Sequence, residues 1–137
     1  MNVLVDTSVW SLALRRILPV GAAVTEELAS LVRRGEVAMI GPIRQEVLSG
    51  VKDASQFRRL RDHLRAFPDV SLDSDDFEEA ATCFNRCRAK GIQGSNTDFL
   101  ICAVAARRRM AIFTTDGDFT EFRRVLPVTL HRAGTRP

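Results

Sequence analysis

The stretch Met1-Asn2-Val3-Leu4-Val5-Asp6-Thr7-Ser8 decides the fold class. Residues 3–5 form a short, continuous apolar run, which is typical of a strand buried on both faces of a parallel sheet. The run ends at Asp6, and the two hydroxyl residues that follow it are good helix caps. Because ligands of open α/β sheets bind at the carboxyl ends of the strands, Asp6 is predicted to lie where chemistry takes place.

Short apolar runs alternate with helical patterns along the rest of the chain. Strands are expected at 3–5, 37–40, 70–72, 110–113 and 128–130. Helices are expected at 8–16, 22–34, 41–50, 55–66, 73–90, 98–109 and 119–124, with a break at Pro19 and Gly21. The alternation predicts right-handed βαβ units that build a three-layer α/β/α sandwich around a mostly parallel sheet. We expect a single domain over residues 1–137, with a loose tail at 131–137.

The composition is that of an ordinary globular protein, with 45% apolar and 27% charged residues. No apolar run approaches the roughly 18 residues of a membrane span, and no signal peptide is recognisable. We therefore expect a cytoplasmic protein without a membrane partner. An odd number of cysteines and no histidine at ligand spacing predict small buried residues rather than disulfides or zinc ligands, at Cys83, Cys87 and Cys102.

The basic residues are almost all arginine, the exceptions being Lys52 and Lys90. Arginine binds phosphate through a planar fork, although genomic base composition explains such a bias equally well. The formal net charge is +3 and the sequence pI is about 9.1.

Individually, the acidic residues have ordinary structural explanations. Asp98 completes the capping-box pattern Ser95-x-x-Asp98, Asp116 begins an Asp-Gly turn, and Asp118 could cap a short helix. Glu46 could be a solvated helix residue. Five further acids occupy the first turns of one helix, where the helix dipole favours them: Asp73, Asp75, Asp76, Glu78 and Glu79.

Taken together, four of these acids are predicted to converge. Asp6 and Asp116 each follow the end of a strand, so they share one edge of the sheet. Glu46 borders the buried face of its helix, and Asp98 heads the buried stripe of its own. Four neighbouring carboxylates stay ionised only if cations neutralise them, and otherwise their pKa values rise.

An all-oxygen cluster without histidine or cysteine suits Mg²⁺ or Mn²⁺. Such ions lower the pKa of a bound water and clamp a phosphoryl group. Removing four negative charges from a net +3 leaves +7 on the remainder of the chain. An acidic pocket in a basic surface is the arrangement expected of a nuclease.

Four segments resemble the PIN-domain family, and in particular its VapC-type toxins: residues 5–10 (Val-Asp-Thr-Ser-Val-Trp), 42–50 (Pro-Ile-Arg-Gln-Glu-Val-Leu-Ser-Gly), 98–105 (Asp-Phe-Leu-Ile-Cys-Ala-Val-Ala) and 114–119 (Thr-Thr-Asp-Gly-Asp-Phe). The resemblance implies a Mg²⁺-dependent endoribonuclease, usually a homodimer, that a small cognate antitoxin holds inactive. It also implies a catalytic and metal-binding set of Asp6, Glu46, Asp98 and Asp116. Asp118 matches a less constant fifth acid, and Thr7, Ser8 and Thr115 match polar positions that support the acids.

Other functions fit the sequence less well. A phosphoacceptor receiver domain would need an acidic pair after its first strand and a lysine near the edge of the sheet. A phosphatase with an aspartate nucleophile would need Asp-x-Asp where the chain has Asp6-Thr7-Ser8. A non-catalytic RNA-binding module of the same fold is the main alternative, and exposed aromatic side chains would favour it. The sequence does not identify the RNA, its cleavage site or the number of metal ions.

Overall fold

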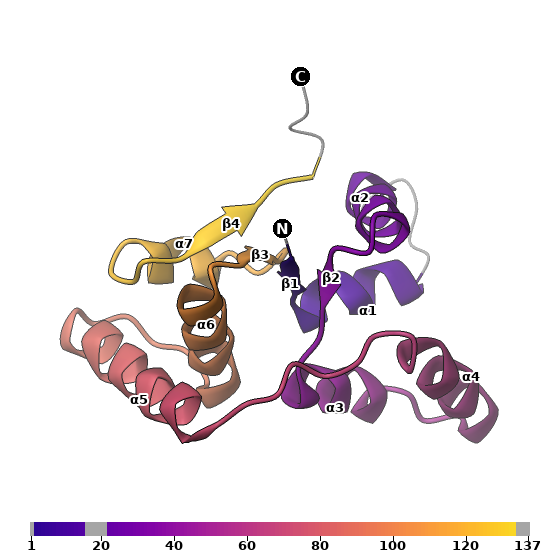
Figure 1. Ribbon diagram of the computed structural model, residues 1–137, viewed down its shortest axis with the longest axis horizontal. Coiled ribbons are helices and arrows are strands. Elements are labelled where there is room, and N and C mark those ends of the chain that lie inside the picture. The colour runs from indigo at the N-terminus through magenta and orange to yellow at the C-terminus, as the bar shows by residue number, and fades with distance from the viewer. Residues whose placement is uncertain (1, 16–21, 134–137) are drawn as a thin grey trace.

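The computed structural model describes residues 2–15 and 22–133, and the sheet at its centre has four parallel strands in the order β2-β1-β3-β4 (Figure 1). The strands are β1 (Val3–Val5), β2 (Val37–Ala38), β3 (Ala111–Phe113) and β4 (Thr129–His131). In the register, Leu4 lies between Ala38 on one side and Ile112 on the other. All three residues of β1 are buried, as expected of a strand covered on both faces.

Helices connect the strands and form the outer layers. They are α1 (Thr7–Arg15), α2 (Ala22–Arg33), α3 (Gly41–Ser49), α4 (Ala54–Leu64), α5 (Ser74–Ala89), α6 (Asn96–Arg108) and α7 (Asp118–Arg123). The first crossover runs one way along the sheet and the later two run the other way. Right-handed connections therefore place α1 and α2 on one face and α6 and α7 on the other, which confirms the predicted α/β/α architecture.

Capping residues and a proline mark the starts of several helices. Pro42 lies in the first turn of α3, where its missing N–H costs nothing. Asp53 caps α4 by accepting a hydrogen bond of 2.8 Å from the backbone N–H of Gln56. Ser95 and Asp98 form the expected capping box at the start of α6. The predicted helix ends lie within two residues of the observed ones.

Two expectations about irregular segments were wrong. Residues 70–72 do not form a strand, because the chain makes only an isolated bridge, between Asp69 and Met39 just after β2, and then turns to cap α5. His131 is not part of a loose tail, since it ends β4 and its Nε2 lies 2.6 Å from Oε2 of Glu27. The expected break at Pro19 and Gly21, and residues 134–137, lie outside the described residues.

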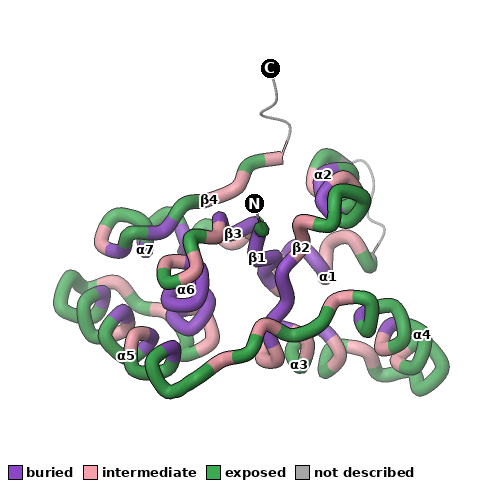
Figure 2. Tube along the Cα trace, viewed as in Figure 1, coloured by how far each residue is buried: buried purple, intermediate pink, exposed green. Residues whose placement is uncertain are grey.

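The core is centred on α6, whose residues 99–105 are all buried (Figure 2). Burial raises the pKa of Cys83 to about 11 and also raises the pKa values of Cys87 and Cys102. All three thiols are free and buried, so the prediction of small core residues is confirmed. Among the described helices, none is long and apolar enough to cross a membrane.

A fully buried carboxylate joins the first turn of α5 to the last turn of α6. Asp76 accepts hydrogen bonds from Arg107 at 2.6 Å and from Nη2 of Arg108 at 2.9 Å. It also closes a capping box with Asp73. The hydrogen bonds from Arg108 hold the pKa of Asp76 well below its usual range, although burial acts in the opposite direction. The sequence placed Asp76 in a structural role but gave no sign of these partners.

Replacing this carboxylate by its neutral isostere (Asp76→Asn) is expected to lower the free energy of unfolding by about 2 kcal/mol at pH 7. The loss should shrink as the pH falls below about 4, where the unfolded chain takes up a proton that the native Asp76 resists. Urea unfolding of both proteins at pH 7 and pH 3.5 measures this. The exposed neighbour offers a control, since Asp75→Asn should change stability by about 0.5 kcal/mol or less. Equal losses in the two variants would contradict the role of Asp76.

Candidate functional site

Asp6 follows the last residue of β1, at the carboxyl end of the parallel strands, and is 6% exposed. Its backbone carbonyl accepts the first hydrogen bonds of α1, from Val9 and Trp10. Two hydroxyl groups donate to its Oδ2 atom, Ser8 Oγ at 2.9 Å and Thr114 Oγ1 at 2.8 Å. The Ser8 hydroxyl therefore orients this carboxylate, in line with the supporting role that the resemblance implied, rather than capping a helix.

Asp116 lies in the turn that follows β3, beside the end of β1. Its backbone N–H donates to Thr114 Oγ1 at 3.0 Å, and its Oδ1 atom accepts from the backbone N–H of Asp118 at 2.9 Å. These bonds fold residues 114–118 into a tight turn that presents the Asp116 carboxylate. Asp118 itself is exposed at the start of α7, which has no side-chain cap.

Asp98 combines the two interpretations that its sequence position allowed. Its Oδ2 atom accepts from the backbone N–H of Ser95 at 3.0 Å, and Ser95 Oγ accepts from the backbone N–H of Asp98 at 3.1 Å. Burial raises the pKa of Asp98, and the nearby carboxylates of Asp116 and Asp6 raise it further, against the hydrogen bonds from Ser95. The capping-box acid is therefore also a member of a cluster of like charges.

Glu46 lies on α3 beside the aspartate cluster and is exposed to solvent. Its Oε1 atom accepts a hydrogen bond of 2.8 Å from Thr7 Oγ1. The two residues share a shallow hollow with Pro42 and with Thr97, which directly precedes Asp98. Glu46 is thus tied to the residue next to Asp6, while Asp6, Asp98 and Asp116 form the centre of the site.

The oxygen atoms of the three aspartates are divided in the same way. One oxygen of each accepts a hydrogen bond from the protein: Oδ2 of Asp6, Oδ2 of Asp98 and Oδ1 of Asp116. Among the described residues, no hydrogen bond reaches the other oxygen of any of the three. Carboxylate oxygens without a hydrogen bond from the protein, on a hydroxyl-lined edge, fit a hard cation such as Mg²⁺.

The metal-free side chains do not enclose an ion by themselves. Within residues 2–15 and 22–133, no three His, Cys, Asp or Glu side chains are close enough to form a ready-made metal centre. The chemistry of the donor set nevertheless fits the ion.

Thr114 is the contributor that the sequence did not single out. The expected supporting residue was Thr115, which is exposed and contributes its backbone N–H, at 3.0 Å from Ser8 Oγ. The side chain that contacts Asp6 belongs to Thr114. One sequence signal could have identified Thr114, which directly follows the last residue of the apolar run that forms β3. That run pairs with β1, and the backbone N–H of Asp6 donates to the carbonyl of Phe113 at 2.9 Å.

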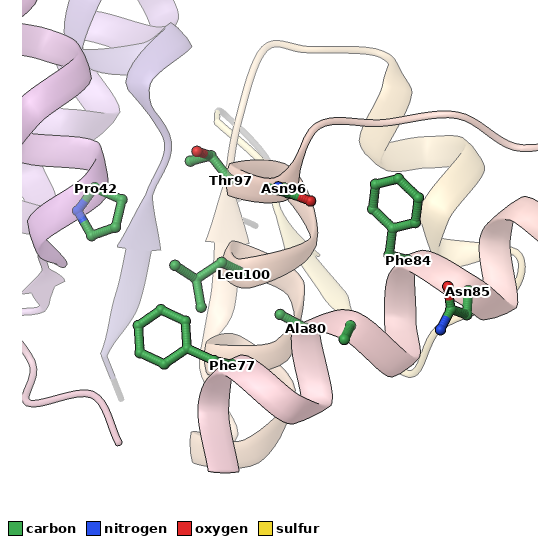
Figure 3. A pocket seen from close by; sticks show the side chains of 9 residues that line it. Pro42, Phe77, Ala80, Phe84, Asn85, Asn96, Thr97 and Leu100 are labelled. Carbon is green, nitrogen blue, oxygen red and sulfur yellow. The ribbon is translucent and has the colours of Figure 1, made fainter. Parts of the chain in front are cut away.

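An apolar groove of about 470 Å³ adjoins the site, between α5 and α6 (Figure 3). Pro42 and Thr97 line both this groove and the hollow that contains Glu46. Phe77 is 54% exposed at the groove, and Figure 3 shows its ring on the side that faces Pro42.

The parallel sheet, with aspartates at the carboxyl ends of its strands, agrees with the family to which the chain is related. A family model for the PIN domain matches residues 3–125, so the chain belongs to the PIN-domain family. Over 125 residues the chain is 31% identical to the VapC ribonuclease Mb1587 of Mycobacterium bovis and to ribonuclease VapC11 of Mycobacterium tuberculosis. Each alignment covers 90% of this chain and 92% of the relative.

Solved structures share the same fold. VapBC2 from Rickettsia felis, bound to a DNA fragment from its promoter, superposes with a TM-score of 0.77 at 18% identity, over 96% of this chain and 98% of that one. VapBC-5 from Mycobacterium tuberculosis, a member of the VapBC family of toxin–antitoxin systems, gives 0.69 at 18% identity, over 97% and 100%. The predicted PIN-like fold is confirmed.

Removing the charge of Asp98 should separate its two structural roles. In EDTA at pH 7, we expect the Asp98→Asn variant to melt at or above the temperature of the wild type, because repulsion from Asp6 and Asp116 is relieved. Because the native pKa of Asp98 is raised, its ionisation costs stability, and this loss begins near the unfolded pKa of about 4 and is complete above the native pKa. The advantage should therefore disappear below about pH 4, where the carboxyl is protonated in both states.

If Asp98 acts only in the capping box, the same substitution should instead cost up to about 1 kcal/mol at every pH. Thermal melting at pH 3.5 and pH 7 distinguishes the two cases. Ser95→Ala is the matched control, because it removes the capping hydroxyl and keeps the Asp98 charge, and it should melt lower at both pH values.

Proposed function

We propose that this protein is a Mg²⁺-dependent endoribonuclease and the toxin of a type II toxin–antitoxin pair. The observation that supports this most directly is the cluster of Asp6, Asp98 and Asp116, in which each carboxylate has one oxygen without a hydrogen bond from the protein. The relationship to proteins named as VapC ribonucleases supports RNA as the substrate. Mn²⁺ is a plausible substitute for Mg²⁺ at an all-oxygen site.

Each residue of the site has a defined task in this proposal. The three central aspartates, with Glu46 beside them, would hold the metal, and Asp118 stands at the margin as a further acid. When bound, the ion would lower the pKa of a water molecule and offset charge on the phosphate. Ser8 and Thr114 orient Asp6, Thr7 orients Glu46, and the Ser95 backbone orients Asp98.

Electrostatics would bring the RNA to this edge of the sheet. The four carboxylates contribute four negative charges, yet the whole chain is +3, so the remainder carries a clear positive excess. Such a distribution attracts a polyanion to the surface and reserves the acidic pocket for cations. A receiver domain or an aspartate-based phosphatase would not need this distribution.

Two protein partners belong to the proposal. One is a small cognate antitoxin, and the structural similarity to VapBC-5, a member of a family of toxin–antitoxin systems, supports it. The other is a second copy of the chain, since the resemblance to VapC-type toxins implies a homodimer. A mass of one chain by light scattering, across the micromolar range, would contradict the dimer. The cytoplasmic location stays a prediction.

Cleavage of RNA should require a divalent metal. With total RNA, we expect cleavage in Mg²⁺ or Mn²⁺, none in EDTA, and recovery when excess Mg²⁺ is restored. The Asp98→Asn variant should retain its fold and lose activity by roughly 100-fold or more, since it removes one ligand charge. Sequencing of the new 5′ ends identifies the cut sites. RNA that is bound but never cut would favour the non-catalytic RNA-binding alternative, and full activity in EDTA would exclude the metal mechanism.

Expression of the active protein should stop growth of its host. We expect arrest on induction of the wild type, normal growth with Asp98→Asn at equal protein levels, and recovery when the small neighbouring gene is coexpressed. Colony counts and immunoblots measure the two quantities. Harmless accumulation of folded, RNA-cleaving wild-type protein would argue against a toxin while leaving the nuclease intact.

A further inference from the structure

The geometry points to Thr114, acting together with Ser8, as a positioning residue that fixes the Asp6 carboxylate and leaves only its Oδ1 atom available to a divalent cation. The inference rests on the proposed metal-dependent function and extends it to Thr114, which lies in the 114–119 motif but was not among the residues expected to support the acids. Three observations carry it: the double hydroxyl contact to one oxygen, the fixed direction of the hydrogen bonds, and the distance in sequence that they span.

The first observation concerns the capacity of the Asp6 oxygens. A carboxylate oxygen has about two lone-pair directions for acceptance. Both hydroxyls, Ser8 Oγ at 2.9 Å and Thr114 Oγ1 at 2.8 Å, donate to the same atom, Oδ2. Oδ2 is therefore occupied by the protein, while no described residue donates to Oδ1. The carboxylate is held in one rotation, with one oxygen assigned to the protein and one to a ligand.

The second observation is that the direction of every hydrogen bond in this network is determined. A hydroxyl has a single hydrogen, and those of Ser8 and Thr114 are both used on Asp6. The two oxygens then accept from backbone N–H groups, Thr114 Oγ1 from Asp116 and Ser8 Oγ from Thr115, each at 3.0 Å. The 3.2 Å approach of the two hydroxyl oxygens is consequently a contact without its own hydrogen.

The third observation is that Thr114 joins two of the site aspartates. Its hydroxyl reaches Asp6, 108 positions earlier in the chain, and accepts from the N–H of Asp116, two positions later. A single side chain thus links the turn after β3 to the end of β1. Thr115, its neighbour, is exposed and has only a main-chain role in the same network.

This arrangement predicts an effect on metal binding itself, separate from the effect on folding. Partners that orient metal-binding carboxylates typically change metal affinity by about 10- to 100-fold when they are removed. Thr114→Val keeps the β-branched shape and removes both the donor and the acceptor. We expect it to weaken Mn²⁺ binding in that range, measured by calorimetry without RNA, well below the melting temperature. Thr114→Ser retains the hydroxyl and should restore binding close to that of the wild type.

Two comparisons isolate the position. Thr82→Val makes the same chemical change on the exposed face of α5, where the hydroxyl bonds to the carbonyl of Glu78, and should leave Mn²⁺ binding and RNA cleavage unchanged. Thr115→Val keeps the backbone N–H and should weaken binding much less than Thr114→Val. In cleavage assays, the Thr114→Val defect should appear mainly as a higher Mn²⁺ requirement and be reduced by saturating Mn²⁺.

Ser8→Ala keeps the proposal testable if Thr114→Val does not fold, because it removes the second donor to the same oxygen and should also weaken Mn²⁺ binding. The inference is overturned if folded Thr114→Val binds Mn²⁺ as the wild type does, if its defect is the same at every Mn²⁺ concentration, or if Thr114→Ser fails to restore binding. It is also overturned if the wild type binds no Mn²⁺. A wild type that binds Mn²⁺ with the expected dependence on Thr114, but cuts no RNA, would refute the proposed function and leave this inference standing.

Discussion

Repulsion between like charges is the constraint on which the candidate site depends. Asp6, Asp98 and Asp116 come from the ends of two strands and the start of one helix. Burial raises the pKa of Asp98, and the nearby charges of Asp116 and Asp6 add to this rise. The protein tolerates this because hydrogen-bond donors of its own engage one oxygen of each carboxylate. The other oxygen of each carboxylate stays available to a cation. A cation that binds these oxygens in the folded protein would stabilise the fold.

The scaffold around the site supports this arrangement from two ends of α6. At the first turn of α6, the capping box holds Asp98 beside the other aspartates. At its last turn, Arg107 and Arg108 donate hydrogen bonds to the buried Asp76 of α5. Between these ends, every residue from 99 to 105 is buried. The helix is therefore anchored along its whole length, and this limits the freedom of Asp98 to move away from its neighbours.

The sequence predicted features that depend on local chemistry and simple periodicity. Residues 3–5 were identified as a buried strand from their continuous apolar run, and the Ser95–Asp98 capping box was read from its spacing. Residues 70–72 were misassigned, because an apolar pair at alternate positions does not reveal that the chain forms only an isolated bridge there, between Asp69 and Met39. The partners of Asp76 and the contact of Thr114 with Asp6 depend on residues about 30 to 108 positions apart, which no local pattern reports.

The position of β1 between β2 and β3 has a consequence for the protein during its synthesis. A chain leaving the ribosome can pair β1 with β2 early, but Asp6 cannot meet Asp116 or Thr114 until the segment beyond residue 111 has emerged. Contacts at such long separation form late, after most of the chain is available to close the loop. A nascent chain close to the ribosome and its RNA therefore lacks the assembled acidic cluster until the domain is almost complete.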